Sequence, residues 1–303
     1  YIPSPKTIFE NIFSLKPATV IKINKGKIVK EINYWKKPEF SMSREKKDKF
    51  TKKDLDNLHQ LIIESVESRI VSDAKKCLFL SSGIDSSLLA SIISKDLKKN
   101  ISCLTVNFKN LNIHDESRDA KKISNFLKLP HKIINPIKQP ENISINTILD
   151  FYGEPNDNIS ISPIKQMSQA ASNLKFKVGI TGMGGDELFF GYHKQAFAYK
   201  YIHLYNMNEK FRIFLSKALS PFSKIFPKIK IYENILGVPD RHLYLALKNM
   251  PIINELNELP NFDLWTKKFF NNFEGKNFFS KIANFELNTG MPDSRLNCYD
   301  YGG

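Results

Sequence analysis

A loop rich in hydroxyl groups is the first part of this sequence whose residue types could support chemistry. Residues 81–87 read Ser-Ser-Gly-Ile-Asp-Ser-Ser and lie between a short apolar stretch and a predicted helix. The free N–H groups and partial positive charge at a helix start favour an anion, and the serine hydroxyls add donors. Asp85 without a metal ion does not fit this pattern, because a carboxylate repels phosphate unless Mg²⁺ lies between them. The loop therefore suits a magnesium-bound phosphate, although a loop of this kind can also serve only as a helix cap.

A second loop, at residues 181–192, repeats this order of strand, glycines and acids. It reads Thr-Gly-Met-Gly-Gly-Asp-Glu-Leu-Phe-Phe-Gly-Tyr, and Asp186 stands where a helix is expected to begin. If both loops follow strands of one sheet, they can hold one polyphosphate and its metal ion from two sides. The pair is much more specific than either loop alone, whose glycines could serve only tight turns. The sequence has no Gly-Lys-Ser or Gly-Lys-Thr run, so ordinary γ-phosphate hydrolysis is not indicated.

An alternation of short apolar strands and helices predicts the sheet that would position both loops. Strands are expected at residues 77–80, 101–108, 132–134 and 177–181. Helices are expected at residues 54–70, 86–97, 116–127, 142–151 and 162–174, with Asp54 as the N-cap of the first. This order predicts an α/β fold, a parallel sheet with flanking helices, which binds ligands at the carboxyl ends of its strands. After residue 192 we expect a helical C-terminal region, broken at Pro221, Pro227, Pro239, Pro251 and Pro260.

Residues 19–32 predict a β-hairpin ahead of this α/β region. Alternating apolar and polar residues flank a turn at Lys25-Gly26-Lys27, and the segment ends at Tyr34-Trp35. A hairpin this short cannot bury both of its faces alone, so we expect it to be the edge of something larger or a lid on the next domain. The polar residues 36–53 are expected to form a linker.

Composition and charge exclude several classes of protein. The 45 Lys and Arg against 31 Asp and Glu give a net charge of +14, but the lysines come as scattered pairs typical of solvated surfaces, so no nucleic acid partner is expected. Neither an apolar run long enough to cross a membrane nor a secretory signal is found, so no membrane partner is expected. Three widely spaced cysteines argue against disulfides and zinc and for a cytoplasmic location, with Cys77 and Cys103 in the core.

The two loops and the stretches between them resemble the asparagine synthase (glutamine-hydrolysing) family. Residues 79–90 resemble the pyrophosphate loop of the N-type ATP pyrophosphatases, the PP-loop superfamily, and residues 182–192 resemble the downstream loop of the asparagine synthase branch. Residues 105–108, Asp115-Glu116-Ser117, His131 and residues 154–157 match further elements of the same synthetase domain in order. The first 40 residues resemble the tail of the family's glutaminase domain.

This resemblance implies an activity and a set of residue roles. A carboxylate, aspartate or a related acid, would attack the α-phosphorus of ATP to give an acyl-adenylate and pyrophosphate. Ammonia from a glutaminase domain, in cis or in trans, would then displace AMP and leave an amide. Asp85 and Asp186 would hold Mg²⁺, and Glu154 and Asp157 would be catalytic residues beside the acyl acceptor. The residues that would bind ATP and pyrophosphate are Leu80, Ser81, Ser82, Gly83, Asp85, Ser86, Ser87, Val106, Thr181 and Gly182. Among them, the backbone of Leu80 and Val106 would receive the adenine.

Two positions depart from the family pattern. Ser82 replaces the usual first glycine of the loop, and a serine there would be strained if the position required a positive φ. Met183 replaces a glutamate tied to forming the aspartyl-adenylate, and methionine can neither take a proton nor orient an ammonium group. Met183 therefore favours a second interpretation, the amidation of a sugar acid or a peptide carboxylate in polysaccharide or secondary metabolism. A third interpretation is an inactive fragment that binds nucleotide.

The resemblance also predicts domain boundaries. Residues 1–40 would be the tail of a glutaminase-like domain, and residues 41–303 would be an ATP pyrophosphatase domain like that of asparagine synthase, truncated at its C-terminus. A glutaminase of this type uses a cysteine at its first position, where this chain has tyrosine. The chain alone is therefore expected neither to hydrolyse glutamine nor to complete the synthetase site.

Overall fold

The computed structural model describes residues 2–36, 50–107, 115–135, 144–156, 160–238 and 278–296. The chain divides into two compact units. The first comprises Tyr1–Pro17, Lys46–Gly185 and Thr289–Gly303, and the second comprises Ala18–Glu45 and Asp186–Asn288.

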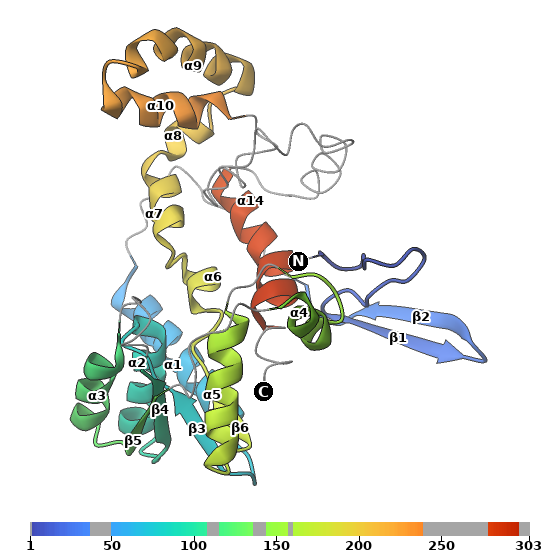
Figure 1. The fold of residues 1–303 in the computed structure, drawn as a ribbon, viewed down its shortest axis with the longest axis vertical. Helices are drawn as coiled ribbons and strands as arrows, with labels where there is room; N and C mark the ends of the chain where they lie inside the picture. The colour runs from blue at the N-terminus through green and yellow to red at the C-terminus, as the bar shows by residue number, and fades with distance from the viewer. Residues whose placement is uncertain are drawn as a thin grey trace. The chain divides into compact units, whose positions relative to one another are not determined.

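A four-stranded parallel sheet forms the centre of the first unit (Figure 1). Its strands are β3 (Lys76–Phe79), β4 (Ser102–Val106), β5 (His131–Ile134) and β6 (Val178–Ile180). Their order is β5-β4-β3-β6, and every neighbouring pair is parallel. The predicted α/β fold is therefore confirmed. The two candidate loops follow β3 and β6, which are neighbours in the sheet, so both loops start from the same edge.

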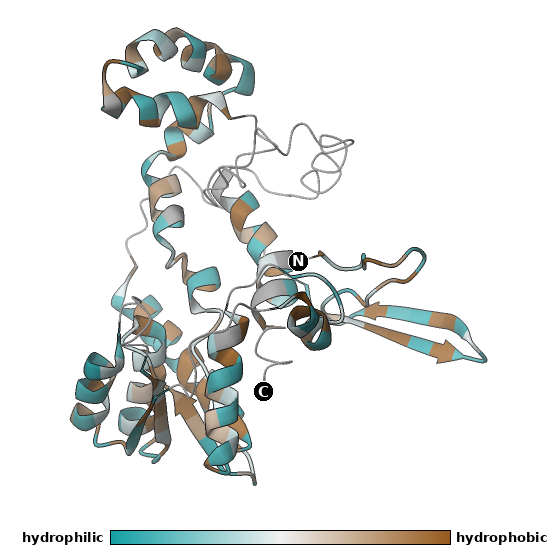
Figure 2. Cartoon of the chain, in the orientation of Figure 1, coloured by the Kyte–Doolittle hydropathy of each residue, from teal (hydrophilic) through white to brown (hydrophobic). Residues whose placement is uncertain are grey.

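Helices cover both faces of this sheet because its strands alternate their apolar side chains between the two sides. Leu78 and Cys103 join a cluster with helices α1 (Lys52–Ile70), α2 (Ile84–Ser91) and α3 (Ser117–Phe126) and the π-helical turn η1 (Ile92–Asp96). Cys77 and Leu104 are the neighbours of Leu78 and Cys103 in their strands and belong to a second cluster on the other face of the sheet. Helix α5 (Ile161–Asn173) contributes to this second cluster. Helix α4 (Ile145–Tyr152) packs against α5 in a smaller cluster. The central strands are correspondingly apolar in Figure 2.

Helix α1 begins earlier than the sequence pattern predicts. Thr51 is its N-cap, and the Thr51 hydroxyl accepts the backbone N–H of Asp54. The Asp54 carboxylate in turn accepts the backbone N–H of Thr51 at 2.9 Å, which completes a capping box. The prediction of Asp54 as N-cap was wrong, because the acid occupies the third helical position of that box.

The predicted hairpin of the second unit is confirmed as β1 (Thr19–Asn24) and β2 (Lys27–Asn33), paired antiparallel. Its turn places Lys25 at φ 49° and Gly26 at φ 74°, the left-handed pair that suits the twist of a hairpin. Large apolar side chains of the hairpin are exposed, among them Val20, Ile23, Ile28, Val29 and Ile32. The hairpin therefore does not bury its apolar side chains by itself, as expected.

The remaining elements of the second unit are helical, as predicted. They are α6 (Gly185–Phe189), α7 (His193–Lys200), α8 (Ile202–Tyr205), α9 (Glu209–Ser223), α10 (Pro227–Gly237), α14 (Phe278–Phe285) and the start of the π-helical segment η3 (Glu286–Leu296). Helices α7, α8, α10 and α14 share a hydrophobic cluster formed by Ala198, Tyr205, Ile235, Ile282 and Phe285. Pro227 opens α10 as predicted, but Pro221 lies inside α9 and does not end it. The expected breaks at Pro239, Pro251 and Pro260 lie outside the described residues.

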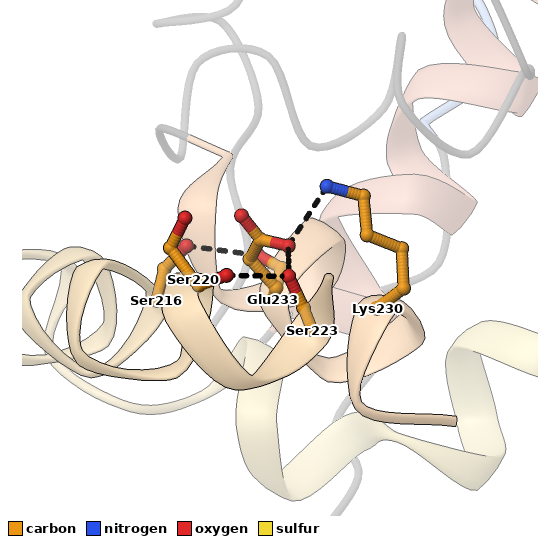
Figure 3. A network of polar contacts seen from close by, with 5 residues as sticks. All are labelled: Ser216, Ser220, Ser223, Lys230 and Glu233. Carbon is orange, nitrogen blue, oxygen red and sulfur yellow. Dashed lines mark hydrogen bonds and ion pairs between the residues drawn. The ribbon is translucent and has the colours of Figure 1, made fainter. Parts of the chain in front are cut away.

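Polar side chains join α9 to α10 (Figure 3). The Ser216 hydroxyl donates to the Glu233 carbonyl at 3.0 Å, and the Ser223 hydroxyl donates to the Ser220 carbonyl and to the Glu233 carboxylate. Lys230 donates to that same carboxylate at 2.8 Å. Beside them, the fully buried guanidinium of Arg212 donates to backbone carbonyls at the end of α10, those of Ile235, Leu236 and Val238.

Cys77 and Cys103 are buried with free thiols, which confirms their predicted place in the core, and Cys298 lies outside the described residues. Burial raises the pKa of the Cys77 thiol to about 11, and burial together with the neighbouring Cys77 raises that of Cys103 to about 12. Among the described residues, no helix has the length and apolar character needed to span a membrane.

Candidate nucleotide site

The serine loop is held in shape by its own hydroxyl groups. Gly83 is the N-cap of α2, with φ −66° and ψ 155°. The Ser81 N–H donates to the Ser86 hydroxyl at 3.1 Å, and the Ser81 and Ser86 hydroxyls lie 2.8 Å apart in a shared hydrogen bond. The Gly83 N–H donates to the Ser81 hydroxyl at 3.1 Å, and the Ser87 hydroxyl donates to the Gly83 carbonyl at 2.7 Å. These hydrogen bonds within the loop hold it in a defined shape.

Ser82 occupies its position without backbone strain. Its φ is not among the positive values found in the described part of the chain, so a serine fits where the family usually has glycine. The Ser82 N–H donates to the carboxylate of Glu116, at the start of α3, at 2.9 Å. Sequence reasoning gave Glu116 no role, although the Asp115-Glu116-Ser117 stretch carried part of the resemblance.

The glycine loop lies directly against the serine loop. A Cβ added at Gly182 would come within 2.8 Å of the Asp85 Cβ and 3.0 Å of the Ser86 backbone nitrogen. A Cβ added at Gly185 would lie 2.5 Å from the carboxyl carbon of Asp85. Side chains cannot be accommodated at either position without a shift, so glycine is required for this approach. The structure therefore brings together Asp85, Ser86, Gly182 and Gly185, and Gly185 is the residue that precedes Asp186 in the chain.

Asp186 lies in a tight turn of its own. The Gly191 N–H donates to the Asp186 backbone carbonyl at 3.1 Å, and a Cβ at Gly191 would fall 2.0 Å from an Asp186 carboxylate oxygen. The carboxylate of Glu187, which is buried, accepts the hydroxyl of Tyr192. In the preceding loop, the Met183 N–H donates to the Thr181 hydroxyl at 3.3 Å. The glycines and Tyr192 of this segment thus fix the local conformation on either side of Asp186.

Leu80 and Val106, the predicted adenine contacts, are both buried. The Leu80 N–H donates to the Leu104 carbonyl at 2.9 Å, so only the Leu80 carbonyl, with two lone pairs, has room for a further hydrogen bond. That carbonyl already accepts the Thr105 hydroxyl at 2.5 Å. Any hydrogen bond between the Leu80 backbone and the adenine is therefore expected to use the Leu80 carbonyl as its acceptor.

His131 supports this strand end from behind. Its two ring nitrogens lie 2.8 Å from the Thr105 hydroxyl and 2.9 Å from the Ser124 hydroxyl. Burial, and then the charge of Lys121, lower the pKa of His131 to about 4. Because Thr105 uses its proton on the Leu80 carbonyl, the neutral imidazole donates from Nε2 to the Thr105 hydroxyl. Its Nδ1 is then an acceptor for the single proton of the Ser124 hydroxyl, which also lies 2.9 Å from the Lys121 carbonyl. These bonds give His131 a supporting role behind Leu80.

Glu154 belongs to a different set of contacts. Burial and the nearby charge of Asp293 raise the pKa of the half-buried Glu154 carboxyl, against a hydrogen bond from the Ile8 backbone. Ser4 donates its N–H and its hydroxyl to the Asp293 carboxylate, at 3.0 and 2.9 Å. Burial raises the pKa of Asp293 despite these bonds. Asp157, the other predicted catalytic acid, lies outside the described residues.

A family model described as asparagine synthase matches residues 57–300. The chain belongs to the asparagine synthase family. A putative asparagine synthetase [glutamine-hydrolyzing] 2 of Methanocaldococcus jannaschii is 26% identical over 258 residues, covering 84% of this chain and 46% of that protein. Asparagine synthetase [glutamine-hydrolyzing] 1 of Bacillus subtilis is 24% identical over 200 residues, covering 64% of this chain and 29% of its own length. The chain therefore spans less than half of these relatives.

An amidase, chry2 of Gibberella zeae, is also similar, at 25% identity over 61% of this chain and 30% of its own length. Among solved structures, the NH3-dependent NAD synthetase of Campylobacter jejuni is 20% identical with a TM-score of 0.32, covering 68% of this chain and 98% of its own. The NMN synthetase of Francisella tularensis is 15% identical with a TM-score of 0.30, covering 82% of this chain and 92% of its own. These TM-scores are too low to support an argument about the fold.

The Asp85 carboxylate is a ligand of the type that Mg²⁺ takes when it binds together with phosphate. Mg²⁺ typically takes one or two protein carboxylates and completes its octahedron with phosphate oxygens and water. Within the described ranges, no group of three or more His, Cys, Asp or Glu side chains could hold a metal without such a ligand. The Asp85 carboxylate lies on the glycine loop, which leads into Asp186, and supplies oxygen donors of the required kind.

Proposed function

We propose that this chain is the synthetase part of an ATP-dependent amide-forming ligase. A carboxylate oxygen of the substrate attacks the α-phosphorus of ATP, and the bond to the β-phosphate oxygen breaks to release pyrophosphate. Ammonia then attacks the acyl carbon of the adenylate, AMP leaves and an amide remains. The observation that carries this proposal is the close packing of Gly182 and Gly185 on Asp85, which joins the serine loop to the glycine loop.

In this proposal the two loops divide the work of binding. The first turn of α2 faces the pyrophosphate in this proposal, since the first-turn N–H groups of a helix have no acceptor within the helix. Asp85 and Asp186 hold Mg²⁺, which neutralises the charge that develops on the leaving pyrophosphate. Thr181 and Gly182 lie beside the nucleotide, and the strand ends at Leu80 and Val106 receive the adenine. Catalysis of this kind is mainly positioning and electrostatic stabilisation.

The acyl acceptor is aspartate or a related acid in the first form of the proposal. Met183 favours another form, in which a sugar acid or a peptide carboxylate is amidated, because methionine offers neither a base nor a partner for an ammonium group. Glu154 and Asp157 are proposed to lie beside this acceptor. Burial raises the pKa of Glu154, a perturbation of the kind found at functional carboxyl groups.

Ammonia is proposed to come from a glutaminase domain, in cis or in trans. The relatives named as glutamine-hydrolysing are more than twice as long as the region matched here. The exposed apolar side chains of the β1–β2 hairpin support the proposal that residues 1–40 complete such a domain, leaving residues 41–303 as the ATP pyrophosphatase part. A cytoplasmic location accords with the free thiols of Cys77 and Cys103.

Carboxylate-dependent exchange of labelled pyrophosphate into ATP tests this function directly. The full-length protein is incubated with MgATP, pyrophosphate and one acid at a time, starting with aspartate and continuing with sugar acids and peptide carboxylates. Exchange with aspartate supports the first form of the proposal, and exchange with another acid supports the second. Binding of MgATP without any exchange would indicate an inactive nucleotide-binding protein and overturn the ligase.

A further inference from the structure

The backbone amides at the start of the serine loop are already used inside the protein. The N–H groups of Ser81 and Gly83 donate to hydroxyls of the loop itself, at 3.1 Å each. The Ser82 N–H, between them, donates to the Glu116 carboxylate at 2.9 Å. An amide has one hydrogen, so none of these three groups can also donate to phosphate while its bond persists. An anion at this loop would therefore have to be bound by other groups, such as first-turn amides of α2, which have no acceptor within the helix.

Glu116 is placed to act on the loop from outside it. It is 34 residues away from Ser82 in sequence and precedes the first residue of α3, on the same side of the sheet as α2. The Glu116 side chain is half-buried, whereas Ser82 is exposed, so the carboxylate is the fixed partner and the loop amide is the group that it restrains. A hydrogen bond to a carboxylate is stronger than one to a neutral acceptor.

We propose that Glu116 is a positioning residue for the pyrophosphate loop. Its carboxylate holds the Ser82 amide away from the phosphate side and keeps the loop in its formed shape before ATP binds. The nucleotide then meets the α2 amides without first having to order the loop, which lowers the cost of binding. This role rests on the proposed function, because it concerns the same nucleotide.

The alternative is a latch, in which the carboxylate occupies an anion position and leaves when phosphate arrives. The two roles predict opposite effects of removing the charge. A positioning residue, or brace, needs only a hydrogen-bond acceptor at this position, so a neutral acceptor preserves its effect. A latch competes with phosphate, so any loss of its charge strengthens nucleotide binding.

Glu116→Gln and Glu116→Ala separate these roles in the full-length protein. We expect Glu116→Gln, which keeps an acceptor oxygen, to change the KM for ATP in pyrophosphate exchange by less than about threefold. We expect Glu116→Ala to raise that KM about tenfold, the equivalent of one lost hydrogen bond, with kcat and the KM for the acid nearly unchanged. Tighter binding of ATP by either variant, or no change in Glu116→Ala, would overturn the brace.

Asp115→Ala is the matched control for an effect that only destabilises α3. The Asp115 carboxylate accepts the Ser117 N–H at 3.1 Å at the start of the same helix. We expect this variant to lower the melting temperature and to leave the KM for ATP unchanged. If Asp115→Ala raises the KM for ATP as much as Glu116→Ala does, Glu116 is merely structural and the proposal fails.

A direct MgATP titration of the same variants keeps this inference separate from the proposed function. If the wild-type protein binds no MgATP, the proposed function fails and takes the inference with it. If the wild-type protein binds MgATP and Glu116→Ala binds it equally well, only the role of Glu116 is wrong.

Discussion

Two hydrogen-bond networks of this protein use similar residue types but have different roles. In the serine loop, Ser81 and Ser86 bond to each other and to loop backbone, and Asp85 packs closely on Gly182 and Gly185. Between α9 and α10, Ser216, Ser223 and Arg212 donate to carbonyls of the partner helix or of their own. The first network shapes the proposed nucleotide site, and the second connects two neighbouring helices.

The difference lies in what each network satisfies. Buried polar groups between helices stabilise the fold only when every hydrogen-bond partner is present. A buried group without its partner destabilises the fold by the full free energy of its desolvation. Groups around a ligand site are held in geometries that serve the ligand, often at little benefit to stability. Substitutions between α9 and α10 should therefore change unfolding, whereas substitutions around Asp85 should change nucleotide binding.

The largest effect is expected for Arg212→Met, which removes the donor of three backbone carbonyls at the end of α10. We expect the free energy of unfolding to fall by about 3 kcal/mol, measured by urea denaturation, because those carbonyls lose a buried donor. Arg69→Ala is the control, since Arg69 is exposed and donates within its own helix at 3.0 Å. Equal stability of the two variants would contradict a structural role for Arg212.

Gly182→Ala should impair nucleotide binding rather than the stability of the fold. Its new Cβ would press on the Asp85 Cβ and the Ser86 backbone nitrogen, so the two loops must separate. We expect the kcat/KM for ATP to fall about 100-fold or more, because such a displacement misplaces groups that bind the nucleotide. Gly26→Ala, at φ 74° with open space around it in the hairpin turn, is the control that strains the backbone elsewhere. If it lowers kcat/KM as much, the loop contact is not the cause.

The hydrogen bonds that His131 makes behind Leu80 should make the free energy of unfolding depend on pH. Its pKa in the folded protein is about 4, below the ordinary value of 6.5, so the unfolded chain takes up the proton first as pH falls. Below pH 6.5 the free energy of unfolding should therefore fall, by up to about 1.4 kcal/mol per pH unit, until about pH 4. Urea denaturation of wild type and His131→Gln across this range checks it, and identical pH profiles would contradict the assignment.

The smallest effect is expected within the α9–α10 network itself. Ser223→Ala removes a buried hydroxyl and should lower the free energy of unfolding by about 1 kcal/mol. Lys230→Ala removes an exposed partner of the same Glu233 and should leave stability unchanged within error, since exposed ion pairs contribute little. Thermal unfolding of both variants compares them, and a larger loss for Lys230→Ala would reverse this ranking.

The sequence predicted those features that depend on local pattern. Alternation in β3 separates Cys77 from Leu78 onto opposite faces, and the strand-loop-helix order gave the parallel sheet. The start of α1 was misplaced because Thr51 and Asp54 share one capping box, and either residue type can be an N-cap. Pro221 was taken as a break, although α9 continues through it to Ser223.

Contacts between distant segments could not be predicted in the same way. Glu116 reaches Ser82 across 34 residues, and Ser4 reaches Asp293 across 289, so both depend on how the chain packs. The contact of Asp85 with the glycine loop was expected from the shared sheet edge, because parallel strands bring their carboxyl ends together. The roles of the predicted site residues remain predictions, and Asp157 lies outside the described residues.

A double-mutant cycle on the two loop carboxylates is the most direct test of the proposed magnesium-nucleotide site. The MgATP affinity of the full-length protein is measured for wild type, Asp85→Asn, Asp186→Asn and the double variant. If both carboxylates hold the same ion, each single change should cost most of the binding and the double change should cost far less than their sum. Strictly additive losses, or no loss in either single variant, would contradict a shared site.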